Sequence, residues 1–234
     1  IHGGGWTLGD LDSEDGVCRL MCSQARVVVI SPDYRLAPEY PYPICFSDSW
    51  ETLLWTIKNS EDLGIDASQV IIAGSSAGGN LVSAVVHQAR VENVMLAGQI
   101  LRIPSTCHID LLPSEGLSSM VENADAPLLS RRSMEIFWSN YNPPKDKLLH
   151  HTVSPLLAST FKGLPPTYVQ VAGLDPLRDE GLRYAKRLLE AGVPMKLDVY
   201  PGVPHAFGYF PELDAAKANA RDLIQGLQWI KSLK

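Results

Sequence analysis

The sequence lacks several features that mark particular classes of protein. No apolar run approaches the roughly 20 residues needed to cross a bilayer. Positive charge is not in excess, because the formal net charge is −6, so neither nucleic acid nor an anionic membrane is expected as the main partner. With only four cysteines nothing demands an oxidising compartment, and the cytoplasm is favoured. The chain begins with Ile1 instead of methionine, so the true N-terminus is expected to be missing and targeting is left open.

Metal ligands are also scarce. Cys18 and Cys22 are four residues apart and would share a face of a helix, but no matching histidines or second cysteine pair accompany them. We therefore interpret them as buried thiols, together with Cys45 and Cys107. Neither a metal nor a cofactor is expected.

Short β-branched runs alternate with segments of helical periodicity, which predicts one α/β domain over residues 1–234. Several of the runs are apolar on both faces, as buried parallel strands are. We expect a mainly parallel sheet with helices on both faces. The predicted strands are 27–31, 70–74, 97–103, 167–172 and 195–200, and the predicted helices are 46–58, 77–90, 180–191 and 214–233.

Two regions interrupt this alternation. Residues 31–43, "SPDYRLAPEYPYP", hold four of the 17 prolines and must form an irregular connection. Residues 104–166 are too long for a simple crossover, although 128–141 has helical periodicity. A long excursion of this kind often covers a binding site, so we predict a lid insertion at about 104–166.

The stretch "GSSAGG" at 74–79 matches the pattern G-x-S-x-G, with Ser76 as its serine. It follows a predicted strand and precedes a predicted helix, so a sharp turn would strain Ser76 and lift its hydroxyl clear of the sheet. A serine that merely caps the helix is the alternative, and the strand before it and helix after it make that interpretation less favoured. Ser76 is therefore the predicted nucleophile.

A serine nucleophile needs a base, and the base needs an acid to orient it. His205 and Asp175 each follow a predicted strand, where parallel sheets place reactive groups. Asp179 competes for the role of acid, but its position at the start of a helix is well explained as a cap, so we favour Asp175. The other histidines, His2, His87, His108, His150 and His151, are interpreted as structural or surface residues.

The chain opens with "IHGGGW", whose glycines expose bare backbone amides. Attack on a carbonyl leaves a negative oxygen, which preorganised N–H groups stabilise. We expect Gly4 and Gly5, with Gly3 as a further candidate, to act with the Ala77 amide as an oxyanion hole. His2 is expected to fix this loop through hydrogen bonds.

Six dispersed segments together resemble the hormone-sensitive lipase family of α/β-hydrolases: "HGGGW", "DYRLAPEYPYP", "GSSAGGNL", "SPLLA", "DPLRDEGLRYAKRLLEAGV" and "YPGVPHAF". The resemblance implies a serine esterase with Ser76, Asp175 and His205 as its triad, acting without a cofactor on small or medium-chain esters. It also implies an acyl pocket mainly in the lid, near Leu111, Leu112, Met120, Leu128, Phe137 and Trp138. Arg35 and Glu39 resemble structural ion-pair residues, and a homodimer through sheet edges is compatible with the family.

The sequence departs from the family pattern in three places. Ser75 stands where the family usually has Asp, and Ala206 stands where Gly is commoner. The resemblance also places a central strand before the glycine loop, between the strands at 27–31 and 70–74, and only Ile1 remains of it. Two earlier strands and the N-terminal part of the lid are expected to be missing too. We therefore expect the chain to be a fragment of a longer protein.

Two further functions are compatible with the same residues. Lactone cleavage or deacetylation in specialised metabolism would use the same triad, because the triad fixes acyl transfer but not the leaving group. A non-catalytic receptor for a small ligand, as plant hormone receptors of this family are, need not keep the base. The presence of Ser76, Asp175 and His205 together favours an enzyme.

Overall fold

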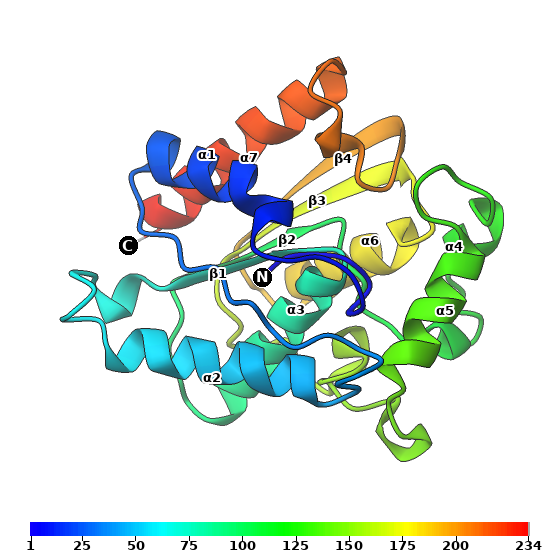
Figure 1. The fold of residues 1–234 in the computed structure, drawn as a ribbon, viewed down its shortest axis with the longest axis horizontal. Helices are drawn as coiled ribbons and strands as arrows, with labels where there is room; N and C mark the ends of the chain where they lie inside the picture. Colours follow the sequence, from blue (N-terminus) through cyan, green and yellow to red (C-terminus); the bar gives the residue numbers. More distant parts are fainter. Residues whose placement is uncertain (234) are drawn as a thin grey trace.

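Four parallel strands form the centre of the molecule (Figure 1). A computed structural model describes residues 1–233. The sheet order is β1-β2-β3-β4, with β1 at Ile71–Ser75, β2 at Gly98–Arg102, β3 at Thr167–Leu174 and β4 at Met195–Pro204. All three neighbouring pairs are parallel. The prediction of a parallel α/β sheet is confirmed.

Side chains alternate between the two faces of each central strand. Leu101 and Val169, which are paired in register, belong to one apolar cluster, whereas Ile100 and Tyr168 belong to another on the opposite face. Both clusters are buried, so these strands have apolar side chains on each face. This double burial explains why the segments read as continuous apolar runs.

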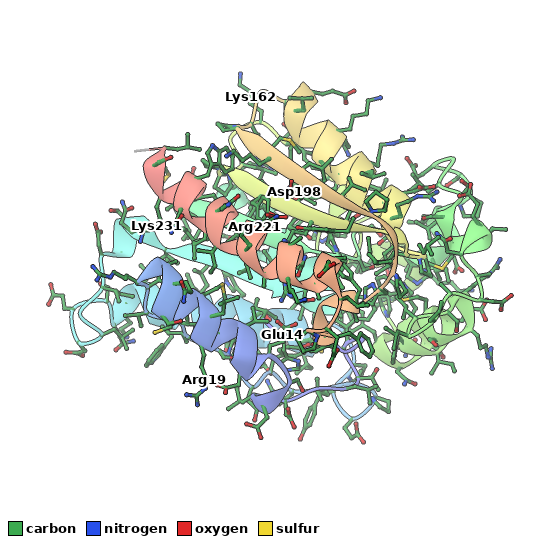
Figure 2. All side chains as sticks on the ribbon, turned by 90° about the horizontal axis from the view of Figure 1, so that it is seen from above. Glu14, Arg19, Lys162, Asp198, Arg221 and Lys231 are labelled. Atoms are coloured by element: carbon green, nitrogen blue, oxygen red, sulfur yellow. The ribbon has the colours of Figure 1, made fainter. Side chains whose placement is uncertain are left out.

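Helices cover both faces of the sheet, as predicted. On one face lie α2 (Ile44–Lys58), α3 (Ala77–Val91) and α6 (Arg178–Glu190), and on the other lie α1 (Asp15–Ala25) and α7 (Asp214–Ser232). The last two helices run side by side (Figures 1 and 2), and Lys231 on α7 donates to the carbonyl oxygen of Ala25 on α1 at 2.9 Å. The short 3₁₀ helices are Asp12–Glu14, Ala67–Gln69, Ile109–Leu111, Lys145–Lys147, Pro155–Leu157 and Phe207–Tyr209.

Part of the segment between β2 and β3 lies beyond the carboxyl ends of the strands (Figure 1). It contains two helices, α4 (Ser119–Glu122) and α5 (Arg131–Tyr141). The helix predicted over 128–141 begins later, because Leu128 has a positive φ of 69° and the side chain of Ser130 caps the amide of Ser133.

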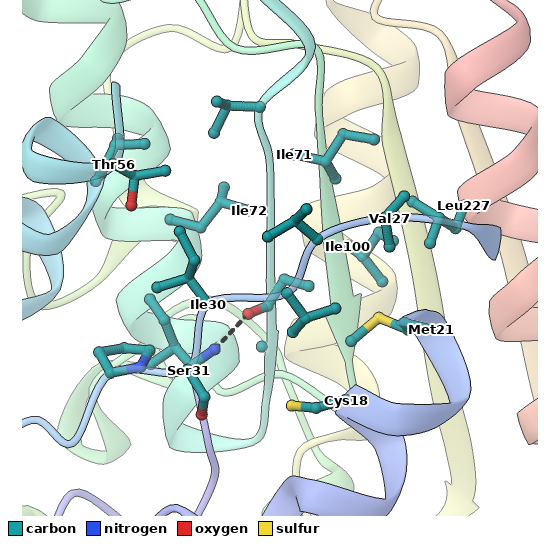
Figure 3. Close-up of a pocket in the computed structure, with 18 of the residues that line it drawn as sticks. Cys18, Met21, Val27, Ile30, Ser31, Thr56, Ile71, Ile72, Ile100 and Leu227 are labelled. Carbon is teal, nitrogen blue, oxygen red and sulfur yellow. Dashed lines mark hydrogen bonds between the residues drawn. The ribbon is translucent and has the colours of Figure 1, made fainter. Parts of the chain in front are cut away.

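The prediction of a strand at 27–31 is wrong. Among the described residues, no ladder hydrogen bond joins this segment to β1. A cavity of about 440 Å³ lies between them instead (Figure 3), lined by Val27, Ile30, Ile71 and Ile72 among others. One bond spans part of the gap, from the Ile1 amino group to the carbonyl oxygen of Ala73 at 2.7 Å. The residues have the composition of a strand, but no adjacent strand pairs with them.

The interpretation of all four cysteines as buried thiols is partly wrong. Cys45 and Cys107 are buried, but Cys18 is half-buried and Cys22 is exposed. The reason is the orientation of α1, which packs Val17, Met21 and Ala25 against the cluster under α7 and turns the neighbouring positions outward. Along the described chain, no helix is long and apolar enough to cross a membrane.

We expect the cavity beside β1 to bind an anionic naphthalene dye under native conditions, because apolar side chains line a space that no protein atoms fill. Val28 lines the cavity and is 59% exposed, so Val28→Glu should fold and weaken dye fluorescence. Met95→Glu, at a site that is 81% exposed and outside the cavity, is the matched control. Equal dye binding by both variants in a fluorescence titration would contradict this assignment.

Candidate active site

Ser76 occupies a strained turn between β1 and α3. Its φ and ψ are 54° and −118°, an unfavourable region for any residue with a side chain. The turn is tight because the chain packs backbone against backbone here: a Cβ on Gly78 would overlap the carbonyl oxygens of Ile1 and His2. The Ser76 amide donates to the Arg102 carbonyl at 2.9 Å, which fixes the turn to β2. The structure therefore has the strained elbow that the sequence predicted.

His205 and Asp175 meet Ser76 from two other strand ends. Asp175 directly follows β3 and His205 directly follows β4. The distance from His205 Nε2 to Ser76 Oγ is 2.9 Å, and that from His205 Nδ1 to Asp175 Oδ2 is 2.7 Å. A carboxylate only accepts, so Nδ1 carries the proton and Nε2 is free to accept from the serine hydroxyl. The three residues that the sequence selected thus form one hydrogen-bonded chain.

The glycine loop passes directly beside the serine. A Cβ on Gly3 would lie 3.0 Å from the Ser75 carbonyl oxygen and 3.4 Å from Ser76 Cβ. The φ angles of Gly4 and Gly5 are 118° and 60°, and the Gly4 carbonyl accepts from the Leu8 amide at 2.8 Å, which closes the loop. Ala77 begins α3, so its amide lies at the positive end of that helix.

His2 holds this loop from behind. Its Nδ1 is 2.7 Å from the Gly3 carbonyl oxygen, and its ring stacks on Tyr34 with centroids 4.2 Å apart. Tyr34 in turn donates its hydroxyl to the His2 carbonyl at 2.9 Å. Burial lowers the pKa of His2, so the ring is neutral at physiological pH. These contacts match the structural role that the sequence suggested.

The glycine loop also contacts α5, in the segment between β2 and β3. Trp6 stacks on Tyr141 of α5 with centroids 4.7 Å apart and packs against Trp138 at 4.3 Å. A Cβ on Gly5 would overlap the ring of Phe137, so that ring lies directly on the glycine. Of the pocket residues named from the resemblance, Leu112, Met120 and Trp138 are buried, whereas Leu128 is exposed.

Other predicted roles differ in their details. Asp179 is a cap, but it caps α4 and not the helix in which it lies, since its carboxylate accepts from the amides of Ser118 and Ser119. Arg35 pairs with Asp48 at 2.6 Å, whereas Glu39 is exposed and makes no ion pair within residues 1–233. The expected ion-pair role is therefore confirmed for Arg35 and is wrong for Glu39.

The remaining histidines lie away from Ser76 in local contacts of their own. His87 is buried against Phe161 and Tyr184, and burial lowers its pKa to about 3. His150 and His151 contact Thr152 and Gln88, respectively. Within residues 1–233, no three His, Cys, Asp or Glu side chains gather closely enough to hold a metal ion.

Comparison with known proteins places the chain in a family. A model described as the alpha/beta hydrolase fold matches residues 1–209. The chain is 41% identical over 224 residues to the carboxylesterase NlhH of Mycobacterium tuberculosis, covering 94% of this chain and 68% of that protein. It is 38% identical over 230 residues to esterase LipI of the same organism, covering 96% and 70%.

The chain belongs to the α/β-hydrolase fold family. Its relatives place it in the hormone-sensitive lipase-like branch. A solved structure described as vibralactone cyclase superposes on this hydrolase with a TM-score of 0.93 at 38% identity, covering 99% of this chain and 70% of that one.

One buried acid beside the triad of this hydrolase was not found from the sequence. Glu180 is 1% exposed, and its Oε1 accepts from the amides of Thr106 and Cys107 at 2.5 and 3.4 Å. Burial raises its pKa to about 8, the charge of Asp175 acts in the same direction, and the two amides only partly oppose them. Its partners lie more than 70 residues away, so no local pattern marked it.

Glu180 should make the stability of the protein depend on pH. Its folded pKa of about 8 lies above the ordinary 4.5, so the folded state binds the proton more tightly. The stabilisation that Glu180 contributes is fully present when the pH is below the ordinary pKa of 4.5. It is lost as the pH rises toward the folded pKa of about 8. We expect Glu180→Gln to flatten the decline in the free energy of unfolding between these pH values. Urea unfolding at three pH values measures the free energy of unfolding of each protein. Parallel declines with pH in the parent and in Glu180→Gln would contradict this expectation.

Ala206 is held in the left-handed region, with φ 57° and ψ 18°, directly after His205. A side chain there costs roughly 1–2 kcal/mol, which glycine avoids. We expect Ala206→Gly to raise the free energy of unfolding by about 1 kcal/mol in urea denaturation. Ala220→Gly, inside α7, is the control and should lower it by about 1 kcal/mol. A loss of stability at position 206 would refute the assigned strain.

Proposed function

We propose that this protein hydrolyses carboxylic esters through an acyl-enzyme formed on Ser76, with His205 as base and Asp175 as the acid that orients it. The protein is a serine carboxylesterase, in agreement with its esterase relatives. The observation that carries the assignment of residues is the continuous chain of hydrogen bonds from Asp175 through His205 to Ser76. No other histidine of residues 1–233 is hydrogen-bonded to that serine.

Acylation follows from this geometry. His205 Nε2 accepts the Ser76 proton as Oγ attacks the ester carbonyl, and Asp175 stabilises the imidazolium that forms. The imidazolium then gives its proton to the departing alkoxide, which leaves as an alcohol. In deacylation, the same nitrogen accepts a proton from water, whose oxygen attacks the acyl carbon. The carboxylic acid departs and Ser76 regains its proton.

The oxyanion formed in both steps requires donors that are in place beforehand. The Ala77 amide is at the start of α3, and the bare amides of Gly4 and Gly5 lie in the loop that passes beside Ser76. We assign these three groups as the oxyanion hole. A missing donor of this kind typically costs about 3–4 kcal/mol of barrier.

The substrate that we infer is a small or medium-chain ester, and the domain is a single unit with its lid at about 104–166. Phe137 and Trp138 of α5 lie against the glycine loop, so the acyl group has an aromatic boundary on that side. β4 is the edge strand, with Leu197 and Val199 partly exposed, and two copies pairing there is compatible with the family.

Two alternatives remain proposals of lower rank. The structural similarity to vibralactone cyclase supports acyl transfer to or from a cyclic ester on the same triad. A ligand receptor on this scaffold would not require His205 to be aligned with Ser76, and the alignment therefore favours the enzyme.

We expect the protein to hydrolyse a chromogenic short-chain ester and to be labelled by an organophosphonate at Ser76. Ser76→Ala should lower kcat by at least about 10³-fold, because the nucleophile is lost. Ser83→Ala, on the same helix with its hydroxyl bonded to the Gly79 carbonyl, is the control and should retain turnover. Stopped-flow absorbance and mass spectrometry of the labelled peptide measure both effects. Undiminished turnover in Ser76→Ala would exclude the mechanism, and binding of an ester without turnover would favour the receptor.

A further inference from the structure

The lid helix α4 and the loop that carries Asp175 are joined by reciprocal hydrogen bonds. Asp179 Oδ2 accepts from the amides of Ser118 and Ser119, each at 2.9 Å. In return, Ser119 Oγ accepts from the Asp179 amide at 3.0 Å and donates to the Pro176 carbonyl at 2.7 Å. Two free amides at the start of α4 are thus satisfied by a residue of another helix.

Two further contacts extend this connection. Asn123 donates its side-chain amide to the Asp175 carbonyl at 3.0 Å. At the surface, Arg178 pairs with Glu122 at 2.6 Å and with Asp179 at 2.8 Å. Ser119 and Asp175 are buried, whereas the Glu122 side chain is 51% exposed. The connection therefore has a buried centre and one exposed ion pair.

Asp179 keeps its negative charge in this setting. Burial acts to raise its pKa, but Arg178 and the amides of Ser119 and Ser118 outweigh it and hold the pKa below its ordinary value. Its bonds to the two amides are therefore charge-assisted, which makes them stronger than bonds between neutral groups.

The same short loop also fixes the orientation of Asp175. Asp175 Oδ1 accepts from the Leu177 amide at 2.8 Å, and Oδ2 faces His205. The Asp175 carbonyl additionally accepts from the Arg178 amide at 3.0 Å. The carboxylate can thus keep its direction toward His205 only while residues 175–178 keep their conformation, and α4 holds the carbonyl oxygens of two of them.

We propose, on the basis of the function above, that Asp179 is a positioning residue that locks the lid segment 117–123 to the loop 175–178 and thereby keeps Asp175 aligned with His205. We call the bonds of Asp179 to Ser118 and Ser119 the lid latch. Asp179 touches none of the reacting atoms. Its effect on the reaction passes through the backbone between it and Asp175.

The charged groups around the latch are few. Glu122 from α4 and Arg178 from α6 face Asp179. The charge of Asp175 acts on Glu180, also on α6, and His205 approaches from the end of β4. Glu180 is kept in every variant of the test.

The test compares three variants of the full 234-residue chain. Asp179→Ala removes the latch, and Asp179→Asn keeps an oxygen that can accept from one amide. Glu122→Gln removes the charge that pairs with Arg178 and keeps an amide oxygen that can still accept from Ser118 Oγ, so it is the matched control. The measurements are kcat and KM on a short-chain ester, each normalised to the serines titrated by an organophosphonate.

In Asp179→Ala we expect kcat to fall by about 10- to 100-fold with KM little changed, because small misplacements of catalytic groups are costly. The acid limb of the kcat/KM profile should move to lower pH, since a misaligned carboxylate stabilises the imidazolium less. Asp179→Asn should recover part of the loss, and Glu122→Gln should stay within about twofold of the parent.

Two results would overturn the latch. The first is that Asp179→Ala has the same kcat per titrated serine as the parent and an unshifted acid limb in its kcat/KM profile. The second is that Glu122→Gln loses as much kcat as Asp179→Ala. If the parent protein neither hydrolyses esters nor reacts with the organophosphonate, the proposed function fails. In that case, proton NMR of His205 Nδ1–H tests the latch. The far-downfield signal of this proton should be present in the parent and in Glu122→Gln and lost in Asp179→Ala. Its retention in Asp179→Ala would refute the latch.

Discussion

The close contact between the first residues of the chain and the turn at Gly78 is the constraint on which the site depends. Only a residue without a side chain lets the carbonyl oxygens of Ile1 and His2 lie against that turn. The contact brings the glycine loop beside Ser76, and it accompanies the strained φ of 54° that lifts the hydroxyl away from the sheet. The carboxyl ends of β3 and β4 lie at the same edge of the parallel sheet as that of β1. The loops after these strands therefore place Asp175 and His205 near Ser76.

The segment between β2 and β3 is an integral part of this arrangement. Trp6 of the glycine loop stacks on Tyr141 and Trp138 of α5, and α4 is bonded to the loop after β3. The two helices of the insertion therefore contact two different parts of the site. Helix α5 packs against the glycine loop, and α4 is bonded to the loop that carries Asp175. These contacts are made to backbone groups as well as to side chains.

The sequence predicted the features of the fold and the site that depend on local patterns and motifs. Strands β1 to β4, the elbow at Ser76 and the choice of His205 and Asp175 follow from apolar runs and the loops after them. The segment 27–31 has strand composition, but pairing depends on a neighbour that composition does not report. Glu180 and the partners of Asp179 could not be found, because their contacts join residues 60 or more positions apart. Arg35 was expected to form an ion pair, but its partner Asp48 lies 13 positions away and no pattern identified it.

The ring of Phe137 lies so close to Gly5 that any side chain at this position would collide with it. This aromatic surface shields the neighbouring peptide dipoles from solvent on that side. Displacement of α5 would expose them to water and raise the local dielectric constant, which weakens their attraction for a nascent alkoxide. The insertion thus contributes to the polarity of the medium around these peptide groups.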